Sequence, residues 1–367
     1  MGPLAGIKII EFGAIGPAPF CSMLLADMGA EVLRIDRRGG RTGIANPRML
    51  DRGKFTIEAD LKSPENIALC LNLIESADVV IEGYRPGVME RLGLGPSTAL
   101  ERNPRLIYGR MTGWGQSGPL AKAAAHDINY IAISGALDCI GPRGGKPIPP
   151  LNLVGDLAGG GVYLALGIAA ALFETQLSGK GQVIDAAITD GTASLMAFIY
   201  GMKADGNWNH ERGDNLCDGG APWYDTYETA DHHYVSIGAF EPQFYSELLE
   251  RLGFDETLLP DRYDKRNWPE LKKKLTEVFA TKTRTQWCEL LEGSETCFAP
   301  VLSLDEAPMH PHNIARNTFV AIHGEMQPAP APRFSRTPSE LSEGGRASVG
   351  TLQNWGISDA DIKRLTS

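Results

Sequence analysis

The sequence has few of the features that mark secreted, metal-binding or membrane proteins. Its six cysteines form no CxxC pair and no metal-type spacing, and no signal-peptide pattern is present. We therefore expect reduced thiols, no metal site and a cytoplasmic protein. The longest apolar run, residues 162–173, is shorter than the roughly 20 residues that span a bilayer. It predicts a buried helix and no membrane partner.

An excess of positive charge is also missing. The chain has 35 basic and 45 acidic residues, a net charge of −10, which argues against nucleic acid as a partner. Any anionic ligand must therefore be bound by a local group of basic residues. Hydrophobic residues make up 43% and charged residues 22% of the chain, as in ordinary globular proteins. At 367 residues, two domains are expected.

What is present is a repeated strand–turn–helix–strand pattern. Residues 7–12 form a β-rich run, a Gly/Pro turn covers 13–19, residues 20–28 have helical periodicity, and 31–36 form a second strand. This order predicts βαβ units and therefore an α/β fold with a parallel, Rossmann-like sheet. The same reasoning predicts strands at 56–59, 79–82, 106–108, 183–187 and 234–238, and helices at 64–76, 242–252 and 269–280.

The composition changes beyond residue 200. We expect a large Rossmann-like domain at 1–200 and a linker rich in tryptophan, tyrosine and glycine at 201–224. A smaller α+β domain is predicted at 225–310. Residues 311–367, with proline-rich stretches, are predicted to form a return linker and a C-terminal segment that packs on the large domain.

Three ionisable residues lie where helices are predicted to begin: His126, the adjacent Asp127, and Asp156. Helix starts expose unpaired N–H groups that stabilise carboxylates and can bind an oxyanion. Taken alone, a histidine is more often structural or solvated, and each aspartate is more often a helix cap. The glycines at 159–161, each costing about 1 kcal/mol inside a helix relative to alanine, favour a close approach of backbone to some other group. Together these features suggest an enzyme that removes a proton and puts it back.

Basic residues gather after three predicted strands. In open parallel sheets this carboxyl edge is where ligands bind, so the pattern predicts a site for a nucleotide or coenzyme phosphate. The residues are Arg34, Arg37, Arg38, Arg41, Lys62, Arg85 and Arg91.

One segment partly matches the motifs of dinucleotide-binding proteins and serine hydrolases. Residues 113–118 match the dinucleotide fingerprint GxGxxG, but Pro119 follows where the helix should open, so the match is weak. The same proline replaces the last glycine of a GxSxG nucleophile elbow, which argues against a serine hydrolase.

Short segments throughout the chain match a known family. They are residues 2–6, 16–19, 28–37, 59–63, 81–88, 91–95, 111–116, 126–130, 149–156, 218–222, 241–245 and 330–335. On these segments the chain resembles the α-methylacyl-CoA racemases of the family III CoA-transferase superfamily. The resemblance implies an interlocked homodimer and an acyl-CoA substrate, with no separate cofactor.

The resemblance also implies residue roles. His126 and Asp156 are implied as the two acid/base residues, supported by Glu241 and Asp127. The implied CoA contacts are Arg37, Ala59, Asp60, Leu61, Lys62, Gly83, Tyr84, Arg85, Arg91, Ala125, Ile128, Asn129 and Tyr130.

The implied reaction inverts the α-carbon of a 2-methylacyl-CoA thioester through an enolate, with one proton carrier on each face. One alternative is a CoA-transferase that uses Asp156 as a nucleophile and has no clear need of His126. Another is a non-catalytic acyl-CoA-binding protein. The acyl group stays open, because branched fatty acyl, sterol side-chain and 2-arylpropionyl thioesters share the same reacting centre.

Overall fold

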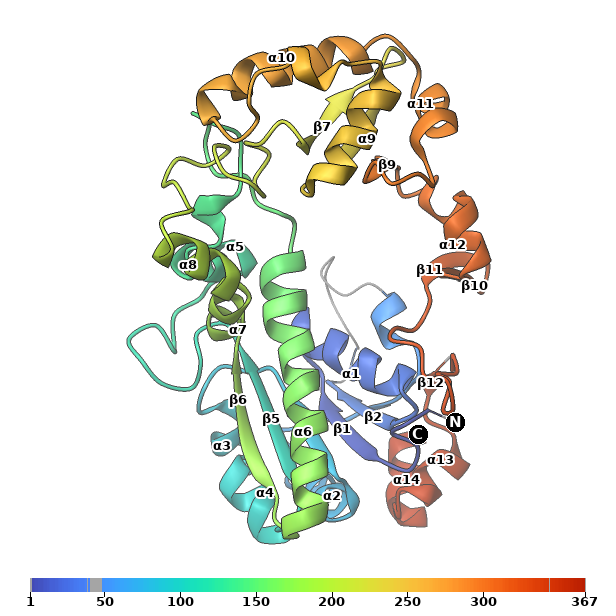
Figure 1. The fold of residues 1–367 in the computed structure, drawn as a ribbon. Helices are drawn as coiled ribbons and strands as arrows, with labels where there is room; N and C mark the ends of the chain where they lie inside the picture. Colours follow the sequence, from blue (N-terminus) through green and yellow to red (C-terminus); the bar gives the residue numbers. More distant parts are fainter. Residues whose placement is uncertain (1, 38, 40–47, 343, 367) are drawn as a thin grey trace. The chain divides into compact units, whose positions relative to one another are not determined.

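The computed structural model describes residues 2–37, 39, 48–342 and 344–366, and Figure 1 shows its elements. The chain divides into two compact units. The larger unit comprises Met1–Ala136, Pro150–Met196 and Phe319–Ser367, and the smaller comprises Leu137–Pro149 and Ala197–Thr318. These limits differ from the predicted ones. The smaller unit includes the predicted linker and takes up residues 137–149, a segment without any boundary pattern in its sequence.

The larger unit is built on a seven-stranded parallel sheet with the order β12-β3-β2-β1-β4-β5-β6. The α/β prediction is therefore confirmed. The strands are β1 (Lys8–Phe12), β2 (Glu31–Asp36), β3 (Lys54–Glu58), β4 (Val79–Glu82), β5 (Ile107–Thr112), β6 (Gln182–Ala187) and β12 (Gly345–Arg346), and a separate antiparallel pair is β10 (Phe319–Ile322) and β11 (Glu325–Pro328).

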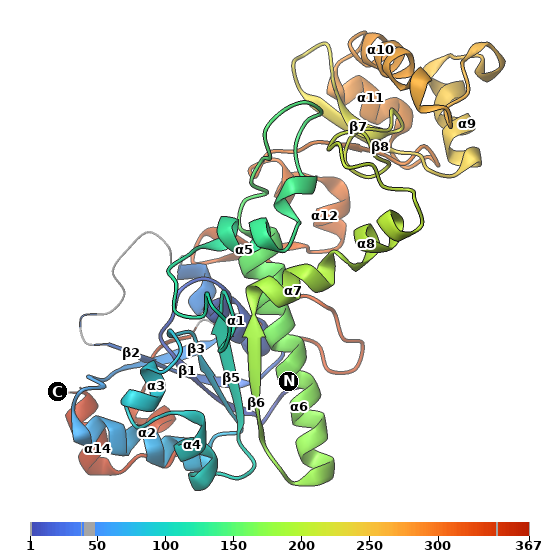
Figure 2. The same cartoon turned by 90° about the vertical axis from the view of Figure 1, so that its left-hand side faces the viewer.

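Helices cover both faces of this sheet, as Figures 1 and 2 show. Alternate residues of a strand point to opposite faces, so Ile10 and Phe12 pack with α2 and the C-terminal helices, while Ile9 packs with α1 and α6. The helices are α1 (Pro17–Asp27), α2 (Pro64–Ser76), α3 (Val88–Arg91), α4 (Pro96–Arg102), α5 (Asp127–Ile133), α6 (Tyr163–Ser178), α7 (Ile188–Leu195), α13 (Val349–Asn354) and α14 (Asp359–Thr366), with a 3-10 turn at Arg48–Asp51.

The smaller unit pairs a three-stranded antiparallel sheet, in the order β7-β8-β9, with several helices. Its core is rich in aromatic side chains, among them Trp223, Phe279 and Trp287. The elements are β7 (Tyr224–Glu228), β8 (Tyr234–Gly238), β9 (Phe298–Pro300), α8 (Ala197–Ala204), α9 (Pro242–Leu252), α10 (Trp268–Phe279), α11 (Arg284–Leu291) and α12 (Pro311–Ala315), with 3-10 turns at Leu137–Cys139, Glu256–Leu258, Lys265–Asn267 and Ala307–Met309.

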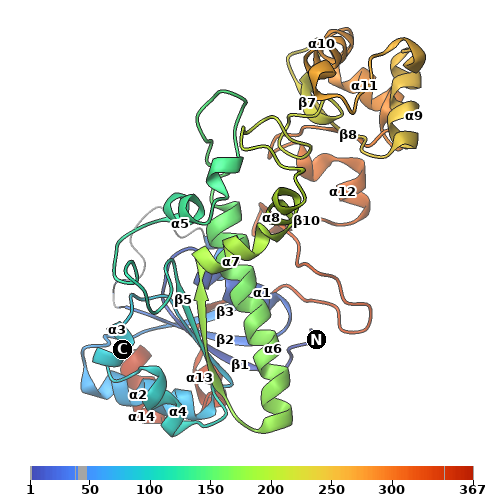
Figure 3. The same ribbon diagram turned by 60° about the vertical axis from the view of Figure 1, so that its left-hand side comes forward.

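Two of the three predicted helix-start residues lie as expected. His126 is the N-cap of α5 and Asp127 its first residue, and Figure 3 shows α5 and α7 beyond the carboxyl ends of β5 and β6. Asp156 also lies near the start of a helix, but that helix begins earlier than predicted and is of another type. Asp156 lies within the first turn of a π-helix, Leu153–Val162, which continues directly into α6. π-Helical turns are rare and occur often at functional sites.

The three consecutive glycines let this π-helix pack closely against its neighbours. A Cβ on Gly159 would lie 2.5 Å from the Thr192 hydroxyl on α7, and one on Gly161 would lie 2.7 Å from the ring of Phe20 on α1. The close approach expected from the sequence is therefore an approach of the protein's own helices.

The prediction of a short, buried apolar helix is also wrong. Together the π-helix and α6 form one segment, Leu153–Ser178, of mean hydropathy 1.6, long and apolar enough by length and composition to cross a membrane. Core helices of globular proteins can meet the same criterion. On α6, however, Leu166, Phe173 and Leu177 are 63%, 67% and 74% exposed, so one apolar face of this helix lacks a partner among the described residues.

Candidate functional site

The candidate acid/base residues come from two adjoining elements of the larger unit. His126 is held at the start of α5, where its backbone N–H donates to the Asn129 side-chain oxygen at 3.1 Å. Asp156 comes from the π-helix. The charge of His126 lowers the pKa of the Asp156 carboxyl, so the two side chains lie within electrostatic range of each other. The structure therefore brings the two predicted proton carriers into one neighbourhood.

Asp156 has an unusual carboxyl group. Its pKa is raised to about 6: burial and, next to it, the negative charge of Asp127 raise the pKa, while a hydrogen bond with Asn152 and the charge of His126 lower it. Gly16, in the turn between β1 and α1, has a φ of 70°, and a Cβ there would lie 3.4 Å from Asp156 Oδ2. Such a carboxyl can hold or release a proton near neutral pH. Sequence reasoning missed Asn152 and Gly16.

Asp127 connects the two elements. Its carboxylate accepts a hydrogen bond of 2.6 Å from the backbone N–H of Asp156, and Gly155 leaves room for it, since a Cβ there would collide with Asp127 Oδ1. Burial raises the pKa of Asp127, while the N–H groups of Asp156 and Gly155 lower it. This contact fits the supporting role that the sequence implied.

A cavity of about 540 Å³ lies beside His126. Seven predicted residues line it: Gly83, Tyr84, Arg85, Ala125, His126, Asn129 and Tyr130. Sequence reasoning missed the rest of its wall, which is mostly apolar and comprises Ile15, Pro86, Met111, Thr112, Gly113, Trp114, Ala121, Ala123 and Ala124.

Tyr130 and Trp114 form one corner of this cavity. Their rings meet edge to face at 4.7 Å, and the Tyr130 hydroxyl donates to the Ala125 carbonyl at 2.7 Å. Ile128, which lies on α5 with Tyr130, is 43% exposed and does not line the cavity. The hydrogen bond from Tyr130 on α5 therefore fixes Ala125, the residue that precedes His126.

The remaining predicted CoA residues follow the carboxyl ends of neighbouring strands. Arg37 comes directly after β2, residues 59–62 come after β3, and Arg91 ends α3 beyond β4. Arg37, Lys62 and Arg91 are exposed, as are Asp60 and Arg85, whereas Ala59 is buried and Leu61 half-buried. Exposed cations on adjacent strand ends can bind phosphate groups. Ala59 is 2% exposed and its backbone N–H donates to the Asp36 carbonyl at 2.8 Å, so its implied CoA contact stays a prediction.

Arg34 does not join these cations, contrary to the prediction from its place in the sequence. Its guanidinium is 1% exposed and pairs with Glu11 at 3.3 Å, Asp36 at 2.7 Å and Asp51 at 3.2 Å. The equally buried Lys54 pairs with Glu11 at 2.8 Å. These ion pairs join β1, β2 and β3. Arg38 and Arg41, which were predicted with Arg34, lie outside the described residues.

Glu82, the last residue of β4, holds the segment that carries Tyr84 and Arg85. The buried Glu82 carboxylate accepts the Tyr84 N–H at 2.7 Å and the Arg110 Nε–H at 2.9 Å. Burial raises the pKa of Glu82, while the N–H of Tyr84 and the Arg110 guanidinium lower it. This ion pair therefore orients the turn that forms part of the cavity wall.

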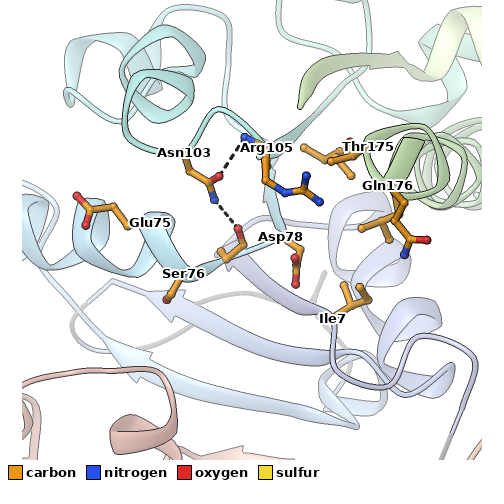
Figure 4. Close-up of a pocket in the computed structure, with 11 residues that line it drawn as sticks. Ile7, Glu75, Ser76, Asp78, Asn103, Arg105, Thr175 and Gln176 are labelled. Carbon is orange, nitrogen blue, oxygen red and sulfur yellow. Dashed lines mark hydrogen bonds between the residues drawn. The ribbon is translucent and has the colours of Figure 1, made fainter. Parts of the chain in front are cut away.

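A second cavity of the larger unit, about 260 Å³, lies at the opposite edge of the sheet, near the residues that precede β1, β4 and β5 (Figure 4). Asn103 crosses it, donating to the Ala77 carbonyl and accepting from the Arg105 N–H. None of the predicted site residues lines it. Ligands in open parallel sheets bind at the carboxyl edge, so we place the functional site at the cavity beside His126.

Glu241 belongs to the smaller unit, where it is the exposed N-cap of α9. Its support of His126 stays a prediction. Among the described residues, no group of three or more His, Cys, Asp or Glu side chains is arranged to hold a metal ion.

Comparison with known proteins defines the class first. Residues 4–345 match the CoA-transferase family III, and the chain belongs to this family. It is 46% identical to the alpha-methylacyl-CoA racemase of Mus musculus and 44% identical to that of Homo sapiens, in each case over 99% of this chain and 96% of the relative. Its fold matches that of a CAIB/BAIF family protein from Brucella suis with a TM-score of 0.82, at 25% identity and over 99% of both chains. The resemblance seen in the sequence is confirmed.

Proposed function

We propose that this protein is a racemase of 2-methylacyl-CoA thioesters, which interconverts the two configurations of the carbon next to the thioester carbonyl. The observation that carries the proposal is the Asp156 carboxyl, with a pKa raised to about 6, in the neighbourhood of His126. The two racemases of similar sequence support the acyl-CoA substrate and the reaction.

The reaction requires a proton to leave one face of the α-carbon and return to the other. Neutral His126 takes the proton in one direction while protonated Asp156 donates, and the roles exchange for the other enantiomer. A pKa of about 6 suits Asp156 to both roles, because both the protonated and the ionised carboxyl cost little free energy at neutral pH. Asp127 holds the Asp156 backbone, and Glu241 orients the His126 imidazole as a carboxylate does in other histidine-dependent enzymes.

Negative charge develops on the thioester oxygen as the proton leaves. The first backbone N–H groups of α5, beside His126, are the donors we propose for this enolate oxygen. Preorganised donors of this kind are often the largest single contribution to catalysis. No metal or redox group is needed in this scheme.

The CoA part of the substrate serves as the handle for binding. The exposed cations Arg37, Lys62, Arg85 and Arg91 bind its phosphates, and the backbone at 59–62 and 83–85 contacts the rest. Binding energy from this remote part positions the α-carbon between the proton carriers. The local cations also resolve the conflict between an anionic ligand and a net charge of −10.

A second copy of the chain is the proposed partner. The exposed apolar side chains Leu166, Phe173 and Leu177 of α6 form a face that a homodimer would cover. Contiguous exposed apolar surface is one mark of a protein–protein interaction site.

The test is to incubate one enantiomer of a 2-methylacyl-CoA in deuterated water. Racemisation together with deuterium at the α-carbon is expected, and His126→Ala should abolish exchange from at least one enantiomer. Retention of configuration without exchange would rule out the mechanism. Membership of a CoA-transferase family makes acyl transfer the second candidate, in which Asp156 is a nucleophile. A CoA adduct on Asp156, detected by mass spectrometry, would favour transfer.

A further inference from the structure

The peptide group that joins Ala125 to His126 is held at both ends by side chains of α5. The Tyr130 hydroxyl donates to the Ala125 carbonyl oxygen at 2.7 Å, and the His126 N–H donates to the Asn129 side-chain oxygen at 3.1 Å. This carbonyl and this N–H belong to one planar group, so the two hydrogen bonds fix the orientation of that plane. The plane comes directly before the Cα of His126 and therefore helps to set the direction in which the imidazole leaves the backbone.

Tyr130 is itself held firmly within the larger unit. It is 9% exposed, and its ring meets that of Trp114 edge to face at 4.7 Å. The ring also lies against Gly113, where a Cβ would collide with it. The Gly113 carbonyl accepts hydrogen bonds from the Thr189 N–H at 3.1 Å and from the Thr189 hydroxyl at 2.8 Å, which ties this wall to α7. The Tyr130 hydroxyl therefore donates from a fixed place.

The Tyr130 hydroxyl keeps its proton at neutral pH. Burial raises its pKa, the charges of Asp156 and Asp127 raise it too, and the Arg85 guanidinium lowers it. A tyrosine hydroxyl has one proton to donate, and the Ala125 carbonyl receives it. Tyr130 therefore has no second proton with which to bind CoA as a donor.

The direction of the His126 imidazole matters for proton transfer. A proton carrier must lie within hydrogen-bond reach of the proton that it takes, and a misplacement of about 1 Å can lower the rate about a hundredfold. His126 is an exposed residue, so packing restrains its side chain less than it would in a core. A fixed backbone at this position limits the directions that the imidazole can take.

We propose that Tyr130 and Asn129 are positioning residues: together they clamp the Ala125–His126 peptide group and so direct the His126 imidazole at the α-carbon. The inference rests on the proposed racemase function. It gives these two residues a role other than the CoA contacts that the resemblance implied.

The test compares four variants of the full-length protein with wild type. Tyr130→Phe removes the hydroxyl and keeps the ring, Asn129→Ala removes the acceptor of the His126 N–H, and a third variant combines the two changes. The matched control is Tyr108→Phe, on β5 of the same unit. It removes a buried hydroxyl that donates to the Leu94 carbonyl at 2.8 Å, and Tyr108 does not line the cavity beside His126.

The measurements are deuterium incorporation at the α-carbon of each enantiomer, with kcat and KM determined separately, and thermal unfolding. Tyr130→Phe and Asn129→Ala should each lower kcat about tenfold with KM nearly unchanged, because the imidazole is misdirected while CoA still binds. The loss should be larger for the enantiomer whose exchange His126→Ala abolishes. Tyr108→Phe should lower the unfolding temperature about as much as Tyr130→Phe and leave kcat unchanged.

The double variant shows whether the two side chains act on the same peptide group. If they do, its loss of kcat should be smaller than the product of the two single losses, because one free end already lets the plane turn. Losses that multiply would overturn the inference. A normal kcat in either single variant would also overturn it, and a raised KM beside that normal kcat would indicate a CoA contact instead.

Two further outcomes separate the inference from stability and from the proposed function. If Tyr130→Phe fails to fold, Asn129→Ala decides by the same criteria for kcat and KM, since its hydrogen bond lies at the surface. A Tyr108→Phe variant that loses kcat as strongly as Tyr130→Phe would show a general effect of lost stability and overturn the inference. Absence of exchange in the wild type would instead refute the proposed function.

Discussion

Asparagine in place of Asp156 should stabilise the larger unit while it abolishes racemisation. Burial, the first cause of the raised pKa, disfavours the ionised carboxylate in the folded state. The pKa rises from 3.8 to about 6, and each unit corresponds to about 1.4 kcal/mol. The gain in the free energy of unfolding from Asp156→Asn is therefore at most about 3 kcal/mol. Because this carboxyl is partly exposed to solvent, the expected gain is about 1–2 kcal/mol.

The gain must depend on pH in a defined direction. The folded pKa lies above the unfolded one, so the folded state binds the proton more tightly. Above pH 6 the wild type is ionised in both states and the folded state bears the full cost. Below pH 3.8 both states are protonated and the cost disappears. The Asp156→Asn variant has no ionisable group there, so its advantage should be large at pH 8 and small at pH 4.

The assay is amide hydrogen exchange of peptides from β1 and β4, which report the opening of the larger unit's core. Variant and wild type are compared at the same pH. Glu101→Gln, which removes an exposed carboxylate from α4 of the same unit, is the charge-matched control and should leave stability unchanged. An Asp156→Asn effect that is absent at pH 8, or equal at both pH values, would refute the assignment of the raised pKa to this carboxyl.

Two more predictions concern the sheet and the assembly. Lys54→Ala leaves the buried Glu11 carboxylate without its closest cation and should destabilise the larger unit by about 3–5 kcal/mol; a loss below about 1 kcal/mol in the same exchange assay would contradict this. The protein should sediment at about twice its chain mass of 39.7 kDa, and Leu166→Glu on α6 should shift it toward the monomer. A wild type that sediments as a monomer at micromolar concentration would argue against the homodimer.

Much of the larger unit could be predicted from the sequence because its strands are continuous apolar runs separated by turn residues. Strands at 31–36 and 79–82 and helices at 64–76 and 242–252 have the predicted limits. Long apolar or strongly periodic segments depend mainly on local patterning. The π-helix was not predicted, because no sequence rule distinguishes its hydrogen bonding from that of an α-helix that begins later.

The site was harder to predict, for reasons that depend on long-range contacts. Arg34 follows the same pattern as Arg37, and only the fold shows that Glu11 and Asp51 surround it. Much of the unpredicted cavity wall comes from the end of β5 and the loop that follows it, residues 111–124, and only the fold shows that this loop faces His126. Asn152 and Gly16 were missed because each matters only through its contact with Asp156. Gly16 lies in a turn far from Asp156 in the sequence, and only the fold brings the two together.

Two neighbouring aspartates receive different roles from their surroundings. The Asp127 carboxylate accepts backbone N–H groups of residues 155 and 156, which lower its pKa against the effect of burial. For Asp156, the charge of Asp127 adds to burial, and the result is a pKa of about 6. Pairs of titratable groups whose environments separate their pKa values identify the proton carrier. Through its hydrogen bond to the Asp156 N–H, Asp127 is suited to anchor the π-helix, and Asp156 to act as the group that gains and loses a proton.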